Sequence, residues 1–292
     1  MLFSARRSIV LSLTGIICLA AAACSQTVAP AGVKGAGQEP FETVAFDEAN
    51  PMTWKLPMEA YLPSDAEQAQ LRKASTALTH DCVRKSGNTA WTPAPALPKL
   101  GPKTLTDWRY GIHDQGLSAK RGYHPDLAEQ AAYDAALRVG LVDGTDVLDP
   151  ATLSSCGRQA AEALGGGQKT YGELAQRLAN EAFIRSKQEP EVAEKFKQWS
   201  ACMKESGRSY KEPLDASDDS RFTGSDVTQP EIDTALADLA CRGRTGVAKT
   251  WFDAEARLQK AAQEQNAQAL RAERGELDRA IKKAAGVLAG GK

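Results

Sequence analysis

Apolar residues recur at intervals of three and four positions in several parts of the chain, a spacing typical of helices with one buried face. Ser64 and Glu67 form an S-x-x-E capping box before the first of these stretches, and Gly87 is suited to end it. The pattern therefore predicts a helix from Ser64 to Gly87. Its apolar positions are Leu71, Ala74, Leu78 and Cys82.

Similar spacing and end signals predict further helices, so the predicted fold class is mainly α. Pro150 and Pro190 stand in predicted first turns, where proline is tolerated, and Thr228 with Glu231 repeats the capping pattern. The segment from Trp108 to Asp126 is rich in glycine and aromatic residues and is predicted to be an ordered loop rather than a helix. The further helical ranges are 124–140, 149–165, 171–187, 190–207 and 228–241.

The C-terminal part of the chain is dominated by good helix formers with few large apolar residues. It predicts a long helix over residues 251–292. Such a polar helix is either exposed to solvent or paired with another helix in a coiled-coil-like manner. The sequence leaves both arrangements open.

The local sequence "CVRKSGNTAW" at Cys82 has a counterpart in "CMKESGRSY" at Cys202. In both, the cysteine lies near the end of a predicted helix, with a glycine five positions later and an aromatic residue beyond. Each copy precedes a second helix with a cysteine, Cys156 or Cys241. We interpret the pattern as a diverged duplication, with one helical unit over residues 52–188 and another over 189–250. Chance similarity is the alternative.

The N-terminus has the features of an export signal. Arg6 and Arg7 precede a short apolar stretch that ends in "LAAAAC", and residues 1–23 are predicted to be a signal peptide. Leu19 to Cys24 resembles the bacterial lipobox, which implies cleavage before Cys24 and acylation of that residue, for example with palmitate. An ordinary signal cleavage that leaves Cys24 unmodified is the alternative. Residues 24–51 mix glycine, alanine, proline and polar residues, so we expect a flexible tether.

The cysteine count agrees with export. If Cys24 is acylated, an even number of cysteines remains in the mature chain, as expected for disulfides in an oxidising compartment. Four cysteines allow three pairings. The order of the repeat favours pairing inside each copy, although unpaired buried cysteines remain the alternative. The residues concerned are Cys82, Cys156, Cys202 and Cys241.

The charge is nearly balanced, with 36 Lys and Arg against 37 Asp and Glu. A nucleic-acid-binding protein needs a concentrated basic face, so no nucleic-acid partner is predicted. Beyond the signal, no apolar run is long enough for a membrane span. The predicted membrane contact is therefore through the N-terminal lipid.

The spacing of the three histidines in the sequence does not match a known catalytic or metal-binding motif. His113, Asp114, His124 and Asp126 could together hold a divalent metal that activates water, but their spacing matches no established metal motif. Local hydrogen bonds are the favoured interpretation for these polar residues. No nucleophile elbow or phosphate-binding loop occurs, so no catalytic residue, metal ligand or cofactor is predicted.

Aromatic residues in the glycine-rich stretch are candidates for contact with a peptide or glycan, because amphipathic rings suit such contacts. The alternative is that they fill the core from a loop. The candidate binding residues are Trp108, Tyr110, His113, Tyr123 and His124.

The lipobox-like start, the C-x4-G helices and the segments "RYGIHDQGLSAKRGYH" and "ACRGRTG" together resemble uncharacterised cell-envelope lipoproteins of actinobacteria. The resemblance implies an extracytoplasmic, disulfide-bonded helical protein held at the cell membrane, and it transfers no activity. The expected function is a non-enzymatic binding or scaffolding module with an envelope protein or glycan as partner. The alternative is a metal-dependent or other hydrolase that uses the loop containing His113 and His124.

Overall fold

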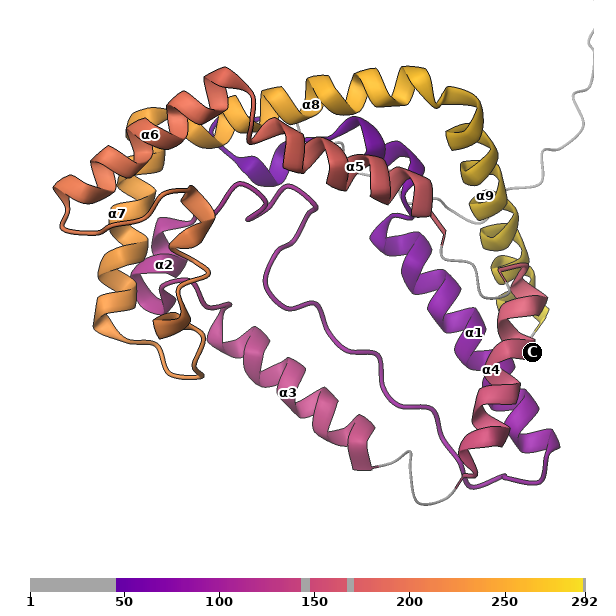
Figure 1. Cartoon of the computed structure of the whole chain (residues 1–292). Helices are drawn as coiled ribbons and strands as arrows, with labels where there is room; N and C mark the ends of the chain where they lie inside the picture. Colours follow the sequence, from indigo (N-terminus) through magenta and orange to yellow (C-terminus); the bar gives the residue numbers. More distant parts are fainter. Residues whose placement is uncertain (1–45, 143–147, 167–170, 291–292) are drawn as a thin grey trace, which may run out of the picture. The chain divides into compact units, whose positions relative to one another are not determined.

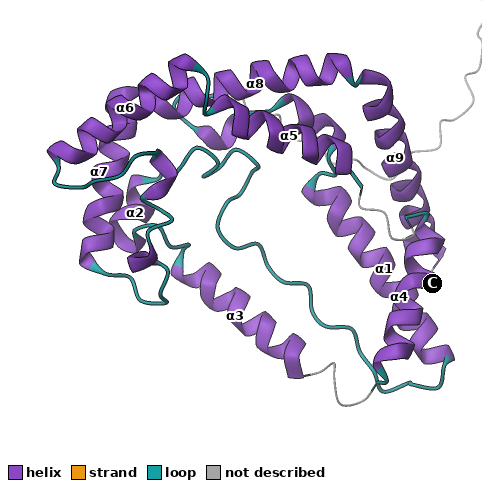
Figure 2. Ribbon diagram, viewed as in Figure 1, coloured by secondary structure: helices purple, strands orange, loops and turns teal. Residues whose placement is uncertain are grey.

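The computed structural model describes residues 46–142, 148–166 and 171–290, and over these ranges the protein is mainly α-helical (Figures 1 and 2). No β-strand occurs in the described ranges. The α-helices are α1 (Asp65–Lys85), α2 (Gln115–Arg121), α3 (Leu127–Val142), α4 (Pro150–Leu164), α5 (Glu173–Ser186), α6 (Pro190–Glu205), α7 (Gln229–Thr245), α8 (Val247–Gln265) and α9 (Ala267–Gly290). Four short 3-10 helices lie between them: η1 (Pro51–Thr53), η2 (Pro57–Tyr61), η3 (Pro213–Asp215) and η4 (Ser220–Phe222). The predicted mainly α fold with a long C-terminal helix is confirmed.

The predicted signal peptide and Cys24 lie outside the described residues. The predicted tether covers residues 24–51, and its last part, from residue 46 onward, is described. There the Asp47 carbonyl accepts a hydrogen bond from Trp54 Nε1 at 2.9 Å, and Asn50 caps η1. The N-terminal boundary of the folded part therefore lies a few residues before the predicted end of the tether.

The helix ends follow the local sequence signals. Ser64 accepts a hydrogen bond from the Glu67 amide, and the Glu67 carboxylate accepts one from the Ser64 amide, so the predicted capping box is confirmed. One segment differs from prediction. Residues Gln115–Arg121, expected to be part of a loop, form α2, because the Asp114 carboxylate accepts a hydrogen bond from the Leu117 amide at 2.9 Å and caps the helix.

The two C-x4-G copies end their helices in the same way. The glycines adopt positive φ angles, 96° at Gly87 and 76° at Gly207, which only glycine adopts readily. In each copy the amide after the glycine donates to the carbonyl of the residue after the cysteine, at 3.2 Å in the first and 3.0 Å in the second. This cap turns the chain back toward the helix. The aromatic residue that follows, Trp91 or Tyr210, then packs in the hydrophobic cluster around its own disulfide.

Both predicted disulfides are confirmed. Cys82–Cys156 joins α1 to α4, and Cys202–Cys241 joins α6 to α7. The two bonds differ in exposure. Cys202 and Cys241 are buried in the largest hydrophobic cluster, whereas Cys82 is only half-buried.

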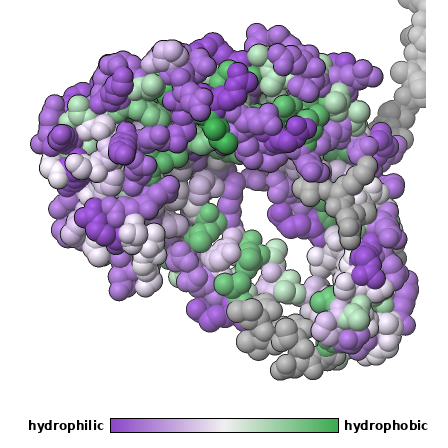
Figure 3. All heavy atoms as spheres, viewed as in Figure 1, coloured by the Kyte–Doolittle hydropathy of each residue, from purple (hydrophilic) through white to green (hydrophobic). Residues whose placement is uncertain are grey.

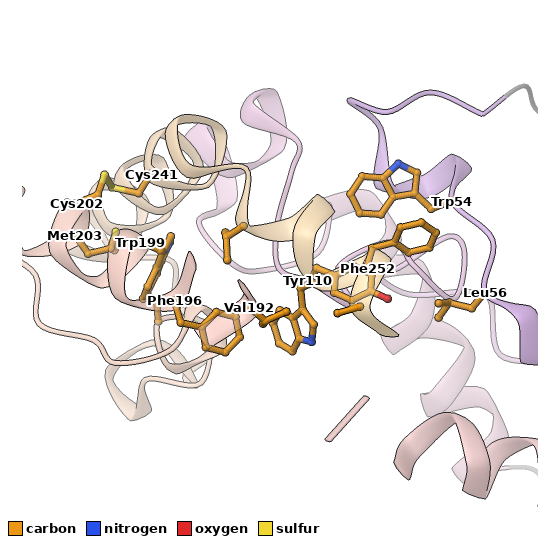
Figure 4. Close-up of a cluster of buried hydrophobic side chains, with 14 residues drawn as sticks. Trp54, Leu56, Tyr110, Val192, Phe196, Trp199, Cys202, Met203, Cys241 and Phe252 are labelled. Atoms are coloured by element: carbon orange, nitrogen blue, oxygen red, sulfur yellow. A yellow bond between two sulfur atoms is a disulfide. The ribbon is translucent and has the colours of Figure 1, made fainter. Parts of the chain in front are cut away.

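That largest cluster gathers aromatic residues from segments that are distant in sequence (Figure 4). Trp199 of α6 and Trp251 of α8 are fully buried, and Trp54 lies near Phe252 with ring centroids 4.8 Å apart. The Cys202–Cys241 disulfide lies at one end of the cluster in Figure 4. A core built from α6, α7, α8 and the segment after η1 therefore forms around large rings.

The C-terminal region differs from the predicted single helix over residues 251–292. The chain leaves helical geometry at Asn266, between α8 and α9, and the predicted boundary at residue 250 lies inside α8. Helix α9 packs against α1 and α4 of the same chain, and Leu277 and Ala284 on its inner face are fully buried. The small alanines complete an apolar stripe that the sparse large residues alone did not reveal.

We predict that each disulfide contributes about 4 kcal/mol to the free energy of unfolding, because each closes a long loop in the unfolded chain. Urea unfolding of the Cys82→Ser/Cys156→Ser and Cys202→Ser/Cys241→Ser variants measures this loss. In the native protein, mild reduction followed by alkylation and mass spectrometry is expected to modify Cys82 and Cys156 first, because Cys82 is partly exposed. Equal rates of reduction at the two bonds would contradict the second expectation.

Candidate functional site

The described residues form a surface groove of about 1160 Å³ between α1, α5 and the extended segment at residues 99–105. Proline at positions 63 and 102 and several aliphatic side chains give it apolar walls. Two of these side chains are notably exposed, Leu105 at 38% and Ile184 at 60%. The apolar residues of the walls are Leu62, Pro63, Leu71, Pro102, Leu105 and Ile184.

Basic and acidic side chains line the rim of the groove and form ion pairs with each other. Lys99 Nζ lies 2.6 Å from the Asp65 carboxylate, and Arg177 lies 3.9 Å from Glu181 on the opposite wall. The charges are largely balanced within the protein, so the rim does not select strongly for an anion or a cation. A ligand with apolar groups and neutral hydrogen-bonding groups, such as an extended peptide or a glycan, suits this combination.

The described lining of the groove lacks the residue pairs that serine and cysteine hydrolases use. It contains no histidine and no cysteine, and its serine, Ser64, is engaged as the cap of α1. Ser-His and Cys-His pairs are therefore absent from this lining, which does contain the carboxylates of Glu59, Asp65, Glu173 and Glu181.

The candidate binding residues predicted from sequence lie elsewhere, along the segment from Trp108 to His124. Tyr110 is 1% exposed, and its hydroxyl donates a hydrogen bond of 2.7 Å to Glu255. Burial and the negative charge of Glu255 raise the pKa of Tyr110 far above its usual value. Trp108 is half-buried and has a positive φ of 60°, in a tight turn bridged to Gly111.

Glu255 of α8 is the centre of a buried polar network. Its side chain is fully buried and is held by Arg109, whose Nε and Nη2 donate at 3.0 and 2.7 Å, in addition to Tyr110. Gln259, one turn later on α8, donates to the same carboxylate at 2.7 Å and accepts from the Met58 amide. The network connects α8 to the segment before α2 and to η2.

A second buried carboxylate, Asp238 of α7, lies beside Arg242 of the same helix at 2.7 Å. Trp199 Nε1 donates to Asp238 at 2.8 Å, and the Tyr123 hydroxyl donates to it at 3.4 Å. Burial is the largest influence on Asp238 and raises its pKa above the ordinary value. Asp238 thus connects α6, α7 and the segment after α2.

Arg242 explains one of the glycines in the loop. Its guanidinium donates hydrogen bonds to the carbonyls of Tyr110 and Pro213. A Cβ at Gly111 would overlap this guanidinium, so a larger residue at position 111 would push the loop away from α7. Close backbone approach, rather than turn geometry alone, requires the glycine.

The third buried carboxylate, Glu231, contacts His124, one of the predicted binding residues. His124 Nδ1 lies 2.7 Å from Glu231 Oε1, and His124 Nε2 lies 2.8 Å from the carbonyl of Gly224. The ring of His124 is therefore held between α7 and the backbone at Gly224. The Tyr123 amide also donates to Glu231, at 2.9 Å. Glu231 therefore holds the start of α3 through contacts with the loop.

His113 has a different acidic partner. Its Nε2 lies 2.7 Å from Asp107 Oδ1, and the Lys103 amide donates to the other oxygen at 2.6 Å. Asp114 and Asp126 instead cap the amides at the starts of α2 and α3. Within the described ranges no three His, Cys, Asp or Glu side chains are grouped in a way that could hold a metal ion. The structure does not bring the four hypothetical ligands together.

Sequence reasoning missed the acidic and basic residues that organise this region. On α7 the apolar residues Ile232 and Leu236 are only half-buried, whereas Glu231 and Asp238 are fully buried. The predicted cap is confirmed in part, since Thr228 accepts a hydrogen bond from the Glu231 amide, but the Glu231 carboxylate faces His124 and Tyr123. The interval of seven residues between Glu231 and Asp238, which places both on one helix face, is the signal that could have indicated their shared role.

The comparisons with known proteins give no relative: no family model, no curated protein and no solved structure matches this chain. In addition, none of the helices in the described residues is long and apolar enough to cross a membrane.

We predict that Glu255→Gln lowers the free energy of unfolding by about 3 kcal/mol, because the change leaves the largely buried Arg109 without its counter-charge. Chemical denaturation measures the difference. Glu191→Gln is the matched control. It breaks an ion pair with Arg257 in which both side chains are well exposed, and it should change stability very little.

We also predict a pH dependence of stability that involves Asp107. Burial alone would raise the pKa of this carboxyl, but hydrogen bonds from His113 and the Lys103 amide outweigh burial and hold the pKa below the usual 3.8. The ionised form therefore stabilises the fold above the unfolded-state pKa, and this contribution is lost as the pH falls through the lower folded-state value. Thermal unfolding measured across acidic pH should show a smaller loss of stability in Asp107→Asn than in the parent protein. Asp226→Asn, at an exposed position, should leave the pH profile unchanged.

Proposed function

We propose that this protein is a lipid-anchored binding or scaffolding module on the extracytoplasmic face of a bacterial membrane. The observation that carries the proposal is the pair of disulfides between helices, Cys82–Cys156 and Cys202–Cys241. Such bonds form and persist in oxidising compartments. They accompany an N-terminal sequence in which an apolar stretch ends in small residues and Cys24.

The groove between α1 and α5 is the proposed contact surface for an envelope protein or glycan. It exposes Leu105 and Ile184, whereas hydrophilic residues dominate the face of the molecule shown in Figure 3. Exposed apolar side chains in a concave site are characteristic of binding surfaces. The Cys82–Cys156 disulfide supports the wall formed by α1, since it fixes α1 against α4.

The hydrolase alternative remains a prediction that no described geometry favours. His113 pairs with Asp107, and His124 pairs with Glu231, so the two histidines have separate acidic partners. In addition, the groove does not include either histidine. We therefore place the proposed role in binding.

Cell fractionation tests the anchor. The parent protein is expected in the membrane fraction and to be released by detergent, while Cys24→Ala loses the acylation site and is expected in the soluble fraction. Mass spectrometry of the mature N-terminus should find an acylated Cys24. An unmodified Cys24, or the same fractionation of both proteins, would refute lipid anchoring without bearing on the groove.

Site-directed crosslinking tests the groove. A photoreactive maleimide attached to Ile184→Cys on intact cells should crosslink a specific envelope component. The same label on Ala261→Cys, an exposed position of α8, is the matched control. Loss of the Ile184 crosslink in a Leu105→Asp variant would support the groove. Identical crosslinking patterns from the two positions would rule it out as the binding surface.

A further inference from the structure

Helix α3 has an unusual distribution of exposed residues. No side chain of α3 from Leu127 to Val139 is buried, and α3 is alone in this among the α-helices of the described ranges. Yet α3 carries few charges and many alanines. An isolated helix of this length is marginal in water, and helices in proteins are stabilised mainly by packing of an apolar face.

The exposed side of α3 carries a row of apolar residues. Leu127, Ala131, Ala135 and Val139 follow each other at intervals of four positions and are all exposed. The side that faces the protein, which includes Glu129, Gln130 and Tyr133, is half-buried, and Glu129 pairs with Lys103. The helix thus leaves a row of apolar side chains in contact with solvent, with Leu127 63% exposed and Val139 47% exposed.

The order of sizes along this row is symmetric. Large residues, Leu127 and Val139, stand at the ends, and two alanines stand between them. A second copy of the helix running in the opposite direction would place Leu127 against Val139 and Ala131 against Ala135. Small residues at the crossing point allow two helices to approach closely, and an isologous contact requires such self-complementarity.

The charges at the ends of α3 agree with the same orientation. Exposed Asp126 caps the amides at the start of the helix, and Arg138 is exposed near its end. Arg138 makes no ion pair with another described residue. In an antiparallel pair each Arg138 approaches the Asp126 end of the other helix, and the two helix dipoles are opposed, which is favourable.

A bilayer is a poorer match for this surface. Helices that lie on membranes combine large apolar and aromatic residues with several cations. The α3 face consists of two alanines, a leucine and a valine, with no tryptophan or phenylalanine, and the helix carries a single arginine. We propose that the exposed face of α3, defined by Leu127, Ala131, Ala135 and Val139, pairs two copies of this chain in an antiparallel arrangement.

The expected strength of the contact follows from its size. A helix of 16 residues is about 24 Å long. One helical face is smaller than the roughly 800 Å² per partner that stable interfaces bury. Association should therefore depend on protein concentration. The proposal does not depend on lipid anchoring or on the groove.

Crosslinking in solution tests the arrangement, with the full chain carrying Cys24→Ser so that no acyl anchor contributes. Ala131→Cys and Ala135→Cys variants are mixed and treated with a short bismaleimide. The mixture should give several times more crosslinked dimer than either variant alone, because antiparallel pairing brings position 131 of one copy to position 135 of the other. Ala261→Cys is the control at an exposed alanine on α8. Equal yields in all samples would overturn the proposal, and efficient crosslinking of Ala131→Cys with itself would indicate parallel pairing and overturn the antiparallel arrangement.

Sedimentation equilibrium gives an independent measurement. Ala131→Glu should weaken dimerisation at least about tenfold, since it places unpaired carboxylates in an apolar contact. Ala261→Glu should leave dimerisation unchanged. Circular dichroism establishes that both variants are folded, as expected for exposed positions. A chain that stays monomeric at all concentrations and binds anionic phospholipid vesicles through Leu127 would assign the face to a membrane instead.

Discussion

The structure depends on three buried carboxylates that must each be neutralised by donors. Glu231, Asp238 and Glu255 are fully buried on α7 and α8. Their partners include residues of the segment from Arg109 to His124, which has only one short helix of its own. Removing one partner of a buried charge is costly, so these contacts favour one arrangement of the segment. These contacts position a segment that has little regular structure of its own.

This arrangement has a functional consequence. Tyr110, His113, Tyr123 and His124 have the chemical character of binding or catalytic residues, but each has a polar side-chain atom that contacts a carboxylate of the protein itself. Their close packing also explains the glycines nearby, because a Cβ at Gly111 or Gly122 would overlap a buried ionic side chain. The contacts of this segment with α7 and α8 thus explain why it is rich in glycine and aromatic residues.

The two disulfides strengthen different regions. Cys202–Cys241 lies within the aromatic cluster, on the two helices that carry Trp199 and Asp238. Cys82–Cys156 instead joins α1 and α4, against which α9 packs. Of these three helices, α1 forms one wall of the groove. A rigid wall lowers the ordering cost of binding, and this agrees with the proposed role as a binding module, while the exposed face of α3 offers a separate surface for self-association.

Local signals in the sequence determined the positions of most helices and their ends. The Ser64–Glu67 capping box and the glycines at 87 and 207 act within one turn of the backbone, so they can be recognised without the fold. The order of the four cysteines was also sufficient to predict their pairing. Only the tertiary structure decided which face of α7 is buried, that α9 packs on α1, and where a groove forms. The physical reason is distance along the chain: the partners of Glu231 and Glu255 lie more than a hundred residues earlier, and no local pattern specifies which buried charge they will satisfy.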